Sequence, residues 1–239
     1  EYKFKKTIDF KNISFSYSKN STYNVLKEIN LIINKGDRIG IIGHSGSGKT
    51  TLMDLLNGLL KPSSGNIYID NKNLHKSKNR EFEESYRRLI SYVPQNIYLT
   101  DNSIAENIAF GVNKKDIDFN KLKEVSKIVQ IDEFINSNPE KYNLIVGEKG
   151  VKLSGGQLQR IGIARALYKD SEIIFLDEAT SALDNVTEEK IIRALSLLDK
   201  NITLIMIAHR LSSLKKCNKV IKITNGQIVK ITTSRELNK

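Results

Sequence analysis

The sequence predicts an α/β fold with a mainly parallel sheet in its core, an antiparallel β subdomain and an α-helical insertion. Strand-like apolar runs alternate with helical segments on both sides of the chain's middle, which is typical of a largely parallel sheet. The first strands have short connections, which predicts antiparallel pairing beside that core. From about Ser103 to Asp170, the apolar residues recur mostly at helical spacing.

The elements follow from apolar periodicity in chain order. We expect these strands: 7–17, Val25–Ile33, Arg38–Ile42, Asn66–Asp70, Leu89–Val93, Ile173–Leu176, Ile202–Ala208, Val220–Ile223 and Gln227–Ile231. A helix is expected over 48–60, because leucines recur at helical spacing before Lys61-Pro62. Leu122, Val125 and Val129 set the helical pattern of the insertion. The core is therefore expected at about 1–100 and 168–239, with the α-helical subdomain at about 101–167.

Length and composition suit one large domain, or a core with a subdomain. The chain has 239 residues, 39% hydrophobic and 27% charged, which is ordinary for a soluble globular protein. No apolar run approaches the roughly 20 residues that span a bilayer, and no signal-peptide pattern follows the first lysines. The chain begins at Glu1 rather than Met, so we expect a fragment of a longer protein. Cys217 is the only cysteine, which excludes an internal disulfide, and we interpret it as inert.

The formal net charge of +11 is compatible with nucleic acid, an anionic membrane surface or phosphate ligands. The lysines are scattered rather than gathered in one block, which favours a solvated basic surface. Charge alone therefore does not discriminate among these partners.

A phosphate-binding loop is predicted where the third strand meets the following helix. Its residues fit G-x-x-x-x-G-K-[ST]: Gly43, His44, Ser45, Gly46, Ser47, Gly48, Lys49 and Thr50. Glycines let successive backbone N–H groups point at phosphate oxygens, and the helix N-terminus adds positive dipole. Lys49 can reach the β- and γ-phosphates, and Thr50 offers a hydroxyl to Mg²⁺. The predicted strand and helix on either side favour nucleotide binding over a chance glycine-rich turn.

Two acids end a buried strand further along the chain. Asp177 and Glu178 directly follow the apolar run Ile173–Leu176. Ligands of parallel sheets bind at the carboxyl ends of strands, so Asp177 suits the Mg²⁺ shell. The adjacent Glu178 can polarise a water for in-line attack on the γ-phosphate. Either acid alone could be a helix cap or a solvated charge.

A third glycine-containing stretch precedes these acids: Leu153, Ser154, Gly155, Gly156 and Gln157. Ser154 fits a helix N-cap, and the glycines allow an anion to approach the backbone closely. Taken alone, this stretch would be interpreted as a plain helix cap.

Together, these motifs resemble the nucleotide-binding domain of an ABC transporter over nearly the whole chain. The stretch Leu153–Gln157 is similar to the family's signature, and Ser181–Asp184 is similar to its D-loop. By resemblance, Tyr17 is the aromatic that stacks on adenine, Gln95 belongs to the Gln loop, and His209 is the switch histidine. Val146–Gly150 and Tyr98–Ile108 resemble exporters more than importers.

Each of these residues has a plainer alternative. Tyr17 could be a strand aromatic, with Tyr23 a rival for the adenine. Gln95 could cap a turn, His209 could be a satisfied histidine at a strand end, and Glu148 could simply face solvent. His44 and His75 are not interpreted as metal ligands. Departures from the family pattern, Lys230 where an acid is common and Thr232 where glycine is frequent, affect only a peripheral strand.

The resemblance implies ATP and Mg²⁺ as ligands and a set of roles for these residues. The implied catalytic residues are Glu178, His209, Lys49 and Gln95, and the implied Mg²⁺ ligands are Thr50, Gln95 and Asp177. The implied nucleotide-binding residues are Tyr17, Gly43, His44, Ser45, Gly46, Ser47, Gly48, Lys49, Thr50, Thr51, Gln95, Ser154, Gly155, Gly156, Gln157, Asp177 and Asp184.

The resemblance also implies two partners. One is a second copy of the domain, bound head to tail, whose signature closes over the γ-phosphate. The other is a transmembrane domain, expected N-terminal to this chain and coupled near Gln95 and Glu148. The implied location is the cytoplasmic face of the inner (plasma) membrane, with the isolated domain soluble.

Other function classes remain open at this stage. One alternative is a soluble ABC ATPase that acts on nucleic acid or ribosomes, although no nucleic acid partner is expected because the chain has neither a long coiled coil nor a second such domain. The others are an importer's ATPase subunit and a degenerate domain that binds ATP without hydrolysing it. Lipid-linked oligosaccharide, lipid, peptide and drug export are not distinguished.

Overall fold

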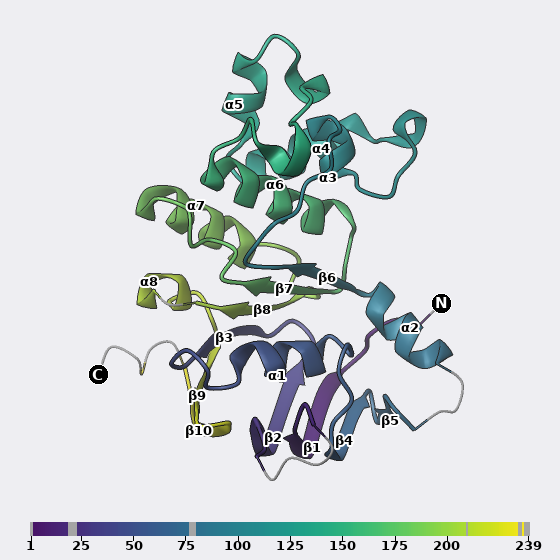
Figure 1. The fold of residues 1–239 in the computed structure, drawn as a ribbon, viewed down its shortest axis with the longest axis vertical. Coiled ribbons are helices and arrows are strands. Elements are labelled where there is room, and N and C mark those ends of the chain that lie inside the picture. The colour runs from purple at the N-terminus through teal and green to yellow at the C-terminus, as the bar shows by residue number, and fades with distance from the viewer. Residues whose placement is uncertain (1, 19–22, 77–79, 209, 234–235, 237–239) are drawn as a thin grey trace. The chain divides into compact units, whose positions relative to one another are not determined.

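A computed structural model describes residues 2–18, 23–76, 80–208, 210–233 and 236 of the chain (Figure 1). The backbone divides into two compact units. The first consists of Glu1–Ile90, Glu172–Phe175 and Asp199–Lys239, and the second of Ser91–Ser171 and Leu176–Leu198. Among the described residues, no helix is both long enough and apolar enough to cross a membrane.

An antiparallel sheet forms part of the first unit, with strand order β2-β1-β4-β5. Its strands are β1 (Thr7–Phe15), β2 (Leu26–Asn34), β4 (Ser64–Ile69) and β5 (Lys72–Asn73). Phe10 of β1 lies opposite Leu31 of β2 and Ile67 of β4, and all three side chains are buried. Such cross-strand apolar pairs stabilise an antiparallel sheet. The predicted antiparallel subdomain is confirmed.

The larger sheet has six strands in the order β10-β9-β3-β8-β7-β6. Its strands are β3 (Arg38–Ile42), β6 (Ile90–Val93), β7 (Ile173–Asp177), β8 (Thr203–Ile207), β9 (Lys219–Thr224) and β10 (Gln227–Thr232). Strand β3 runs parallel to both of its neighbours, β8 and β9, whereas β10 pairs antiparallel with β9. Every residue of β7 and β8 is buried, as in the continuous apolar strands of parallel sheets. The predicted α/β core is confirmed.

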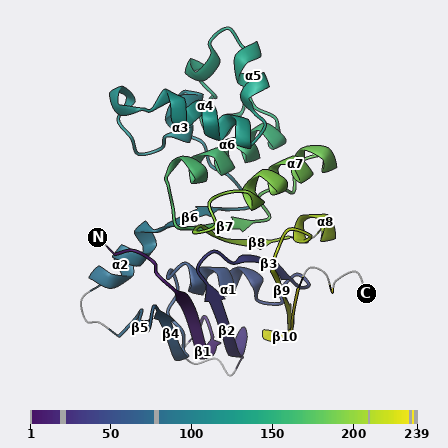
Figure 2. The same cartoon turned by 180° about the vertical axis from the view of Figure 1, so that it is seen from behind.

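The first unit contains the helices α1 (Lys49–Leu56), α2 (Glu81–Arg88) and α8 (Leu211–Leu214). In both views α1 lies between β3 and the strands β1 and β2 (Figures 1 and 2). It is shorter than the predicted helix over 48–60, because the chain turns at Gly58, whose φ is +67°. Helix α2 was not predicted, since Tyr86 is its only buried residue and no apolar stripe marks it.

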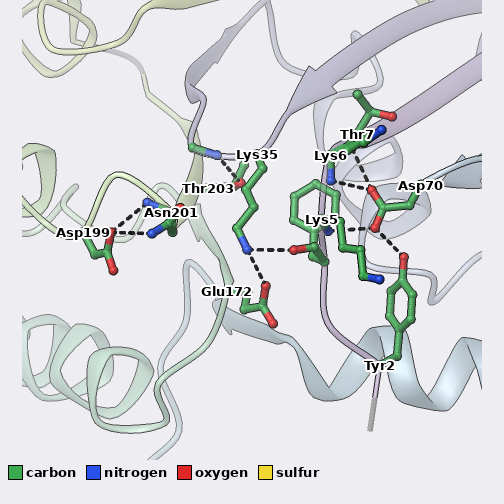
Figure 3. Close-up of polar contacts among 12 residues, drawn as sticks. Tyr2, Lys5, Lys6, Thr7, Lys35, Asp70, Glu172, Asp199, Asn201 and Thr203 are labelled. Atoms are coloured by element: carbon green, nitrogen blue, oxygen red, sulfur yellow. Dashed lines mark hydrogen bonds and ion pairs between the residues drawn. The ribbon is translucent and has the colours of Figure 1, made fainter.

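The start of the chain is tied to the β4–β5 turn by one carboxylate (Figure 3). Asp70 accepts hydrogen bonds from the backbone N–H groups of Lys5, Lys6 and Thr7 and from the Tyr2 hydroxyl, at 2.6–2.9 Å. Burial acts to raise the pKa of Asp70, but these hydrogen bonds outweigh it and hold the pKa below its ordinary value. The first strand therefore enters the sheet from a fixed position.

The second unit is mostly helical. Its helices are α3 (Ile104–Ile108), α4 (Phe119–Ile128), α5 (Asp132–Ser137), α6 (Gly155–Tyr168) and α7 (Asn185–Ser196), with 3₁₀ turns η1 (Lys114–Asp116), η2 (Lys141–Asn143) and η3 (Glu148–Gly150). Leu122, Val125 and Val129 are all buried, which confirms the helical pattern predicted for the insertion. Helix α7 was not predicted, although its buried Ile191, Ile192 and Leu195 lie at helical spacing.

Candidate functional site

The predicted phosphate loop joins the end of β3 to the start of α1 in the first unit. A Cβ atom added at Gly43 would lie 2.4 Å from the Ile223 carbonyl oxygen and 2.5 Å from Ser47 Oγ, so only glycine fits there. Gly48, directly before α1, has φ +103°, a conformation that favours glycine. Among the described residues, no side chain caps α1. The first backbone N–H groups of α1 are therefore available to a ligand.

Two buried polar groups lie within this loop. The Lys49 side chain is buried, and its Nζ donates to the carbonyl oxygens of Gly43 at 2.9 Å and His44 at 3.0 Å. Ser47 Oγ is buried and has no hydrogen-bond partner among the described residues. A buried cation and an unpaired hydroxyl beside an uncapped helix fit an anionic ligand such as a phosphate chain.

Tyr17 lies beside the first turn of α1. Its hydroxyl forms a hydrogen bond of 3.1 Å with Thr51 Oγ1, and its ring packs edge-on against Phe15, with ring centroids 4.9 Å apart. Tyr17 is nevertheless 67% exposed, which leaves part of its ring surface for a planar ligand to contact. The rival, Tyr23, is also exposed and lies under the amine of Lys27. The contact with Thr51 favours Tyr17.

The two predicted acids lie at the end of β7. Asp177 is buried and accepts a 2.9 Å hydrogen bond from the Tyr92 hydroxyl. Glu178 follows with φ +50°, and Gln95 Nε2 donates to Glu178 Oε2 at 2.8 Å. The structure therefore brings Gln95 to Glu178, a pairing that the sequence did not indicate. Tyr92 was also missed, although it precedes Gln95 by only three residues.

The predicted signature forms the N-terminus of α6. Ser154 is the N-cap, as predicted, and forms a capping box: Ser154 Oγ accepts from the Gln157 N–H, and Gln157 Oε1 accepts from the Ser154 N–H. Gly155 and Gly156 form the first turn. The capping box fixes the orientation of the Ser154 side chain.

The predicted D-loop residue Asp184 is the N-cap of α7. Its carboxylate accepts hydrogen bonds from the N–H groups of Val186 and Thr187. Hydrogen bonds from Thr187, and then from Val186, lower the pKa of Asp184. This carboxylate therefore already has backbone donors within its own chain.

The remaining predicted residues are exposed or lie outside the described residues. His44, Ser45, Thr50 and Glu148 are exposed. His209 falls outside the residues that the structure describes. Cys217 is buried, and burial raises its thiol pKa to about 12, so the thiol is protonated at neutral pH.

The predicted residues divide between the two units. The phosphate loop and Tyr17 belong to the first unit, whereas Gln95, the signature, Asp177, Glu178 and Asp184 belong to the second.

The chain has relatives among known proteins. Residues 26–181 match the ABC transporter family. The chain is 41% identical over 230 residues to an ATP-dependent lipid A-core flippase of Legionella pneumophila (strain Paris), covering 96% of this chain and 38% of the flippase. It is 44% identical over 230 residues to the alpha-hemolysin translocation ATP-binding protein HlyB of Escherichia coli O157:H7, covering 96% of this chain and 32% of HlyB.

A solved structure of an ABC exporter is also similar to this chain. A bacterial Atm1-family ABC exporter with ATP bound superposes with a TM-score of 0.88 at 32% identity, covering 97% of this chain and 40% of that one. The chain thus spans well under half the length of the relatives it matches. The family match and the identity to these relatives, together with the phosphate loop and the signature helix, show that the chain belongs to the ABC transporter family.

Proposed function

We propose that this chain binds ATP with Mg²⁺ and hydrolyses it as the nucleotide-binding domain of an ABC exporter or flippase. The observation that carries the proposal is the N-terminus of α1. There, a glycine-built turn, an uncapped first helical turn and the buried amine of Lys49 come together. The similarity to a lipid A-core flippase and to an Atm1-family ABC exporter supports this proposal.

The phosphate chain would lie on the α1 N-terminus. Lys49 Nζ would exchange the carbonyl oxygens of Gly43 and His44 for phosphate oxygens, which carry full negative charge and make stronger acceptors. Ser47 Oγ would gain the partner it lacks among the described residues. The adenine would stack on the exposed ring of Tyr17.

Three side chains would hold the metal ion. Thr50, Gln95 and Asp177 supply a hydroxyl, an amide and a carboxylate oxygen, the hard ligands that Mg²⁺ prefers. Bound Mg²⁺ would neutralise negative charge on the phosphate oxygens.

Glu178 would orient or deprotonate the attacking water. The Gln95 amide donates to one carboxylate oxygen of Glu178, which helps to hold the carboxylate in one orientation. Lys49 and His209 would counter the negative charge that develops in the transition state.

A second copy of the domain would complete each site. Two copies would meet head to tail, so that Ser154, Gly155 and Gly156 of one close over the γ-phosphate held by the other. Loss of the γ-phosphate would remove these contacts and let the pair separate, so the interface would act as a γ-phosphate switch.

The other partner would be a transmembrane domain, N-terminal to this chain and coupled near Gln95 and Glu148. ATP hydrolysis at the cytoplasmic face of the membrane would then power export or flipping. We further propose that the core spans about 1–100 and 168–239 and the helical subdomain about 101–167. Lipid-linked oligosaccharide, lipid, peptide and drug remain the substrate classes to test.

The test is a MgATP titration and a phosphate-release assay on the wild-type chain and on Glu178→Gln. Glu178→Gln should bind MgATP with wild-type affinity, because the substitution leaves the phosphate loop intact. Its turnover should fall by about 10³-fold, the usual contribution of a general base. Glu133→Gln, an exposed glutamate on α5, is the matched control and should retain both properties. Near wild-type turnover in Glu178→Gln would show that Glu178 is not the base.

A further inference from the structure

We propose that Gln159 is a positioning residue for the proposed ATP hydrolysis. It fixes the loop of Ser181 and Ala182 against the start of α6, so that the signature and the D-loop form one preassembled half-site. This inference rests on the proposed function, because it concerns the surface that one copy offers to ATP bound by the other.

The first observation is that Gln159 uses both ends of its side-chain amide on the same loop. The residue lies in α6, five positions after Ser154, and is only 4% exposed. Its Nε2 donates to Ser181 Oγ at 3.0 Å, and its Oε1 accepts from the Ala182 N–H at 2.8 Å. Two bonds from one planar amide to consecutive residues fix both the position and the orientation of the loop.

The second observation is how closely this loop approaches the signature. A Cβ atom added at Gly156 would lie 3.4 Å from the Ala182 carbonyl oxygen and 3.4 Å from Leu183 Cδ2. One added at Gly155 would lie 3.5 Å from Ala182 Cβ. The first turn of α6 and the loop therefore lie close together, with space between them for little more than a methyl group, so a shift of the loop changes the surroundings of the signature.

The third observation connects this pair to Glu178. The Ser181 N–H donates to the Glu178 carbonyl oxygen at 3.0 Å, while the Ser181 hydroxyl binds Gln159. Gln95 in turn donates to the Glu178 carboxylate. A continuous series of hydrogen bonds thus runs from α6 through Ser181 to Glu178, all within the second unit.

Gln159 therefore has two effects on hydrolysis. It holds the turn that sets the direction of Glu178, and it holds the D-loop beside Ser154. Neither effect involves the phosphate loop, which belongs to the first unit. Loss of Gln159 should accordingly lower turnover without changing how tightly a single copy binds ATP.

The test compares four variants of the chain by phosphate release and by MgATP titration. Gln159→Met preserves the side-chain length but removes both hydrogen bonds, and its kcat should fall about tenfold, the effect of losing one to two buried hydrogen bonds. Ser181→Ala removes one bond, and its kcat should fall about threefold. The double variant should match Gln159→Met, because both substitutions break the same contact.

Rescue separates positioning from packing. Gln159→Glu retains an acceptor for the Ala182 N–H and a second oxygen for the Ser181 hydroxyl, so its kcat should recover to within about threefold of wild type. The control variants Gln227→Met and Ser137→Ala, both at exposed positions, should leave kcat unchanged. The MgATP affinity should stay within about twofold of wild type in every variant.

The outcomes are separable. Wild-type kcat in both Gln159→Met and Ser181→Ala, in a wild-type chain that hydrolyses ATP, would overturn the role of Gln159 and leave the proposed function standing. If Gln159→Met fails to fold, Ser181→Ala alone decides by the same criterion. A wild-type chain that neither binds nor hydrolyses MgATP would overturn both proposals.

Discussion

The N-termini of α1 and α6 are both glycine-rich, but they differ in how they are capped. Gly48 precedes α1, and no side chain in the described part of the chain caps that helix. Ser154 precedes α6 and forms a complete capping box with Gln157. Among the described residues, no side chain accepts from the first N–H groups of α1, which leaves them and the helix dipole to a ligand, whereas the side chains of Ser154 and Gln157 accept from two backbone N–H groups at the start of α6.

The polar side chains around the two helix N-termini also differ in how many of their hydrogen bonds the chain itself satisfies. Near α1, Ser47 Oγ has no partner among the described residues, and Lys49 bonds only to nearby carbonyl oxygens. Near α6, Gln159 binds the adjacent loop through both ends of its amide. We infer that the groups near α1 form their hydrogen bonds when a ligand binds. The N-terminus of α6 is already held by hydrogen bonds within the chain, and we infer that it contacts a ligand that is bound elsewhere.

The largest expected effect is at α1. Lys49→Ala should weaken MgATP binding by about 10²-fold, because it removes charge-assisted hydrogen bonds to phosphate. Turnover should fall with it. Titration calorimetry measures the affinity, with the exposed Lys123 changed to Ala as control. Wild-type MgATP affinity in Lys49→Ala would show that Lys49 at the start of α1 does not bind the nucleotide, and would contradict the difference proposed between α1 and α6.

Tyr17 extends the comparison to the base of the nucleotide. Tyr17→Ala should weaken MgATP binding by about tenfold, the effect of losing one base–aromatic stack. Tyr17→Phe should bind nearly as wild type, because the ring remains and only the hydrogen bond to Thr51 is lost. If Tyr23→Ala has the larger effect in the same titration, the rival tyrosine holds the adenine.

At α6, the expected effect is smaller and of another kind. Ser154→Ala should lower stability by about 1 kcal/mol through loss of the N-cap. It should lower turnover by about fivefold, as expected for one lost hydrogen bond, while MgATP affinity stays unchanged. Ser154→Thr, which retains a capping hydroxyl, is the control. A weaker MgATP affinity in Ser154→Ala would mean that α6 binds nucleotide before a second copy arrives.

The smallest effect is expected at α7, another helix with a side-chain cap. Hydrogen bonds lower the pKa of Asp184 in the folded state, so its contribution to stability is present above the ordinary aspartate pKa and is lost as the pH falls through the lowered value. Asp184→Asn keeps a capping oxygen and should melt close to wild type at pH 7. Thermal melts from pH 7 to pH 2 compare the wild-type chain with Asp184→Ala. The difference between their melting temperatures should shrink as the pH falls and the Asp184 carboxylate is protonated. A constant difference would contradict capping by the carboxylate.

The sequence predicted the parts of this comparison that depend on local chemistry. The predicted bounds of β3 and the predicted N-cap Ser154 agree with the structure, because strand burial and helix capping depend mainly on residues that are neighbours in the sequence. Helix α2 was missed because its sequence is polar on nearly every face. The pairings of Gln95 with Glu178 and of Gln159 with Ser181 were also missed, since they join residues 83 and 22 positions apart. Only the folded chain brings those residues together.

The most direct test of the account is the solution mass of Glu178→Gln, measured by light scattering with and without MgATP. The account predicts a monomer without nucleotide and a dimer with MgATP, because the α6 N-terminus of one copy closes on the nucleotide held at α1 of the other. A chain that binds MgATP in a parallel titration but remains monomeric would contradict the role assigned to α6.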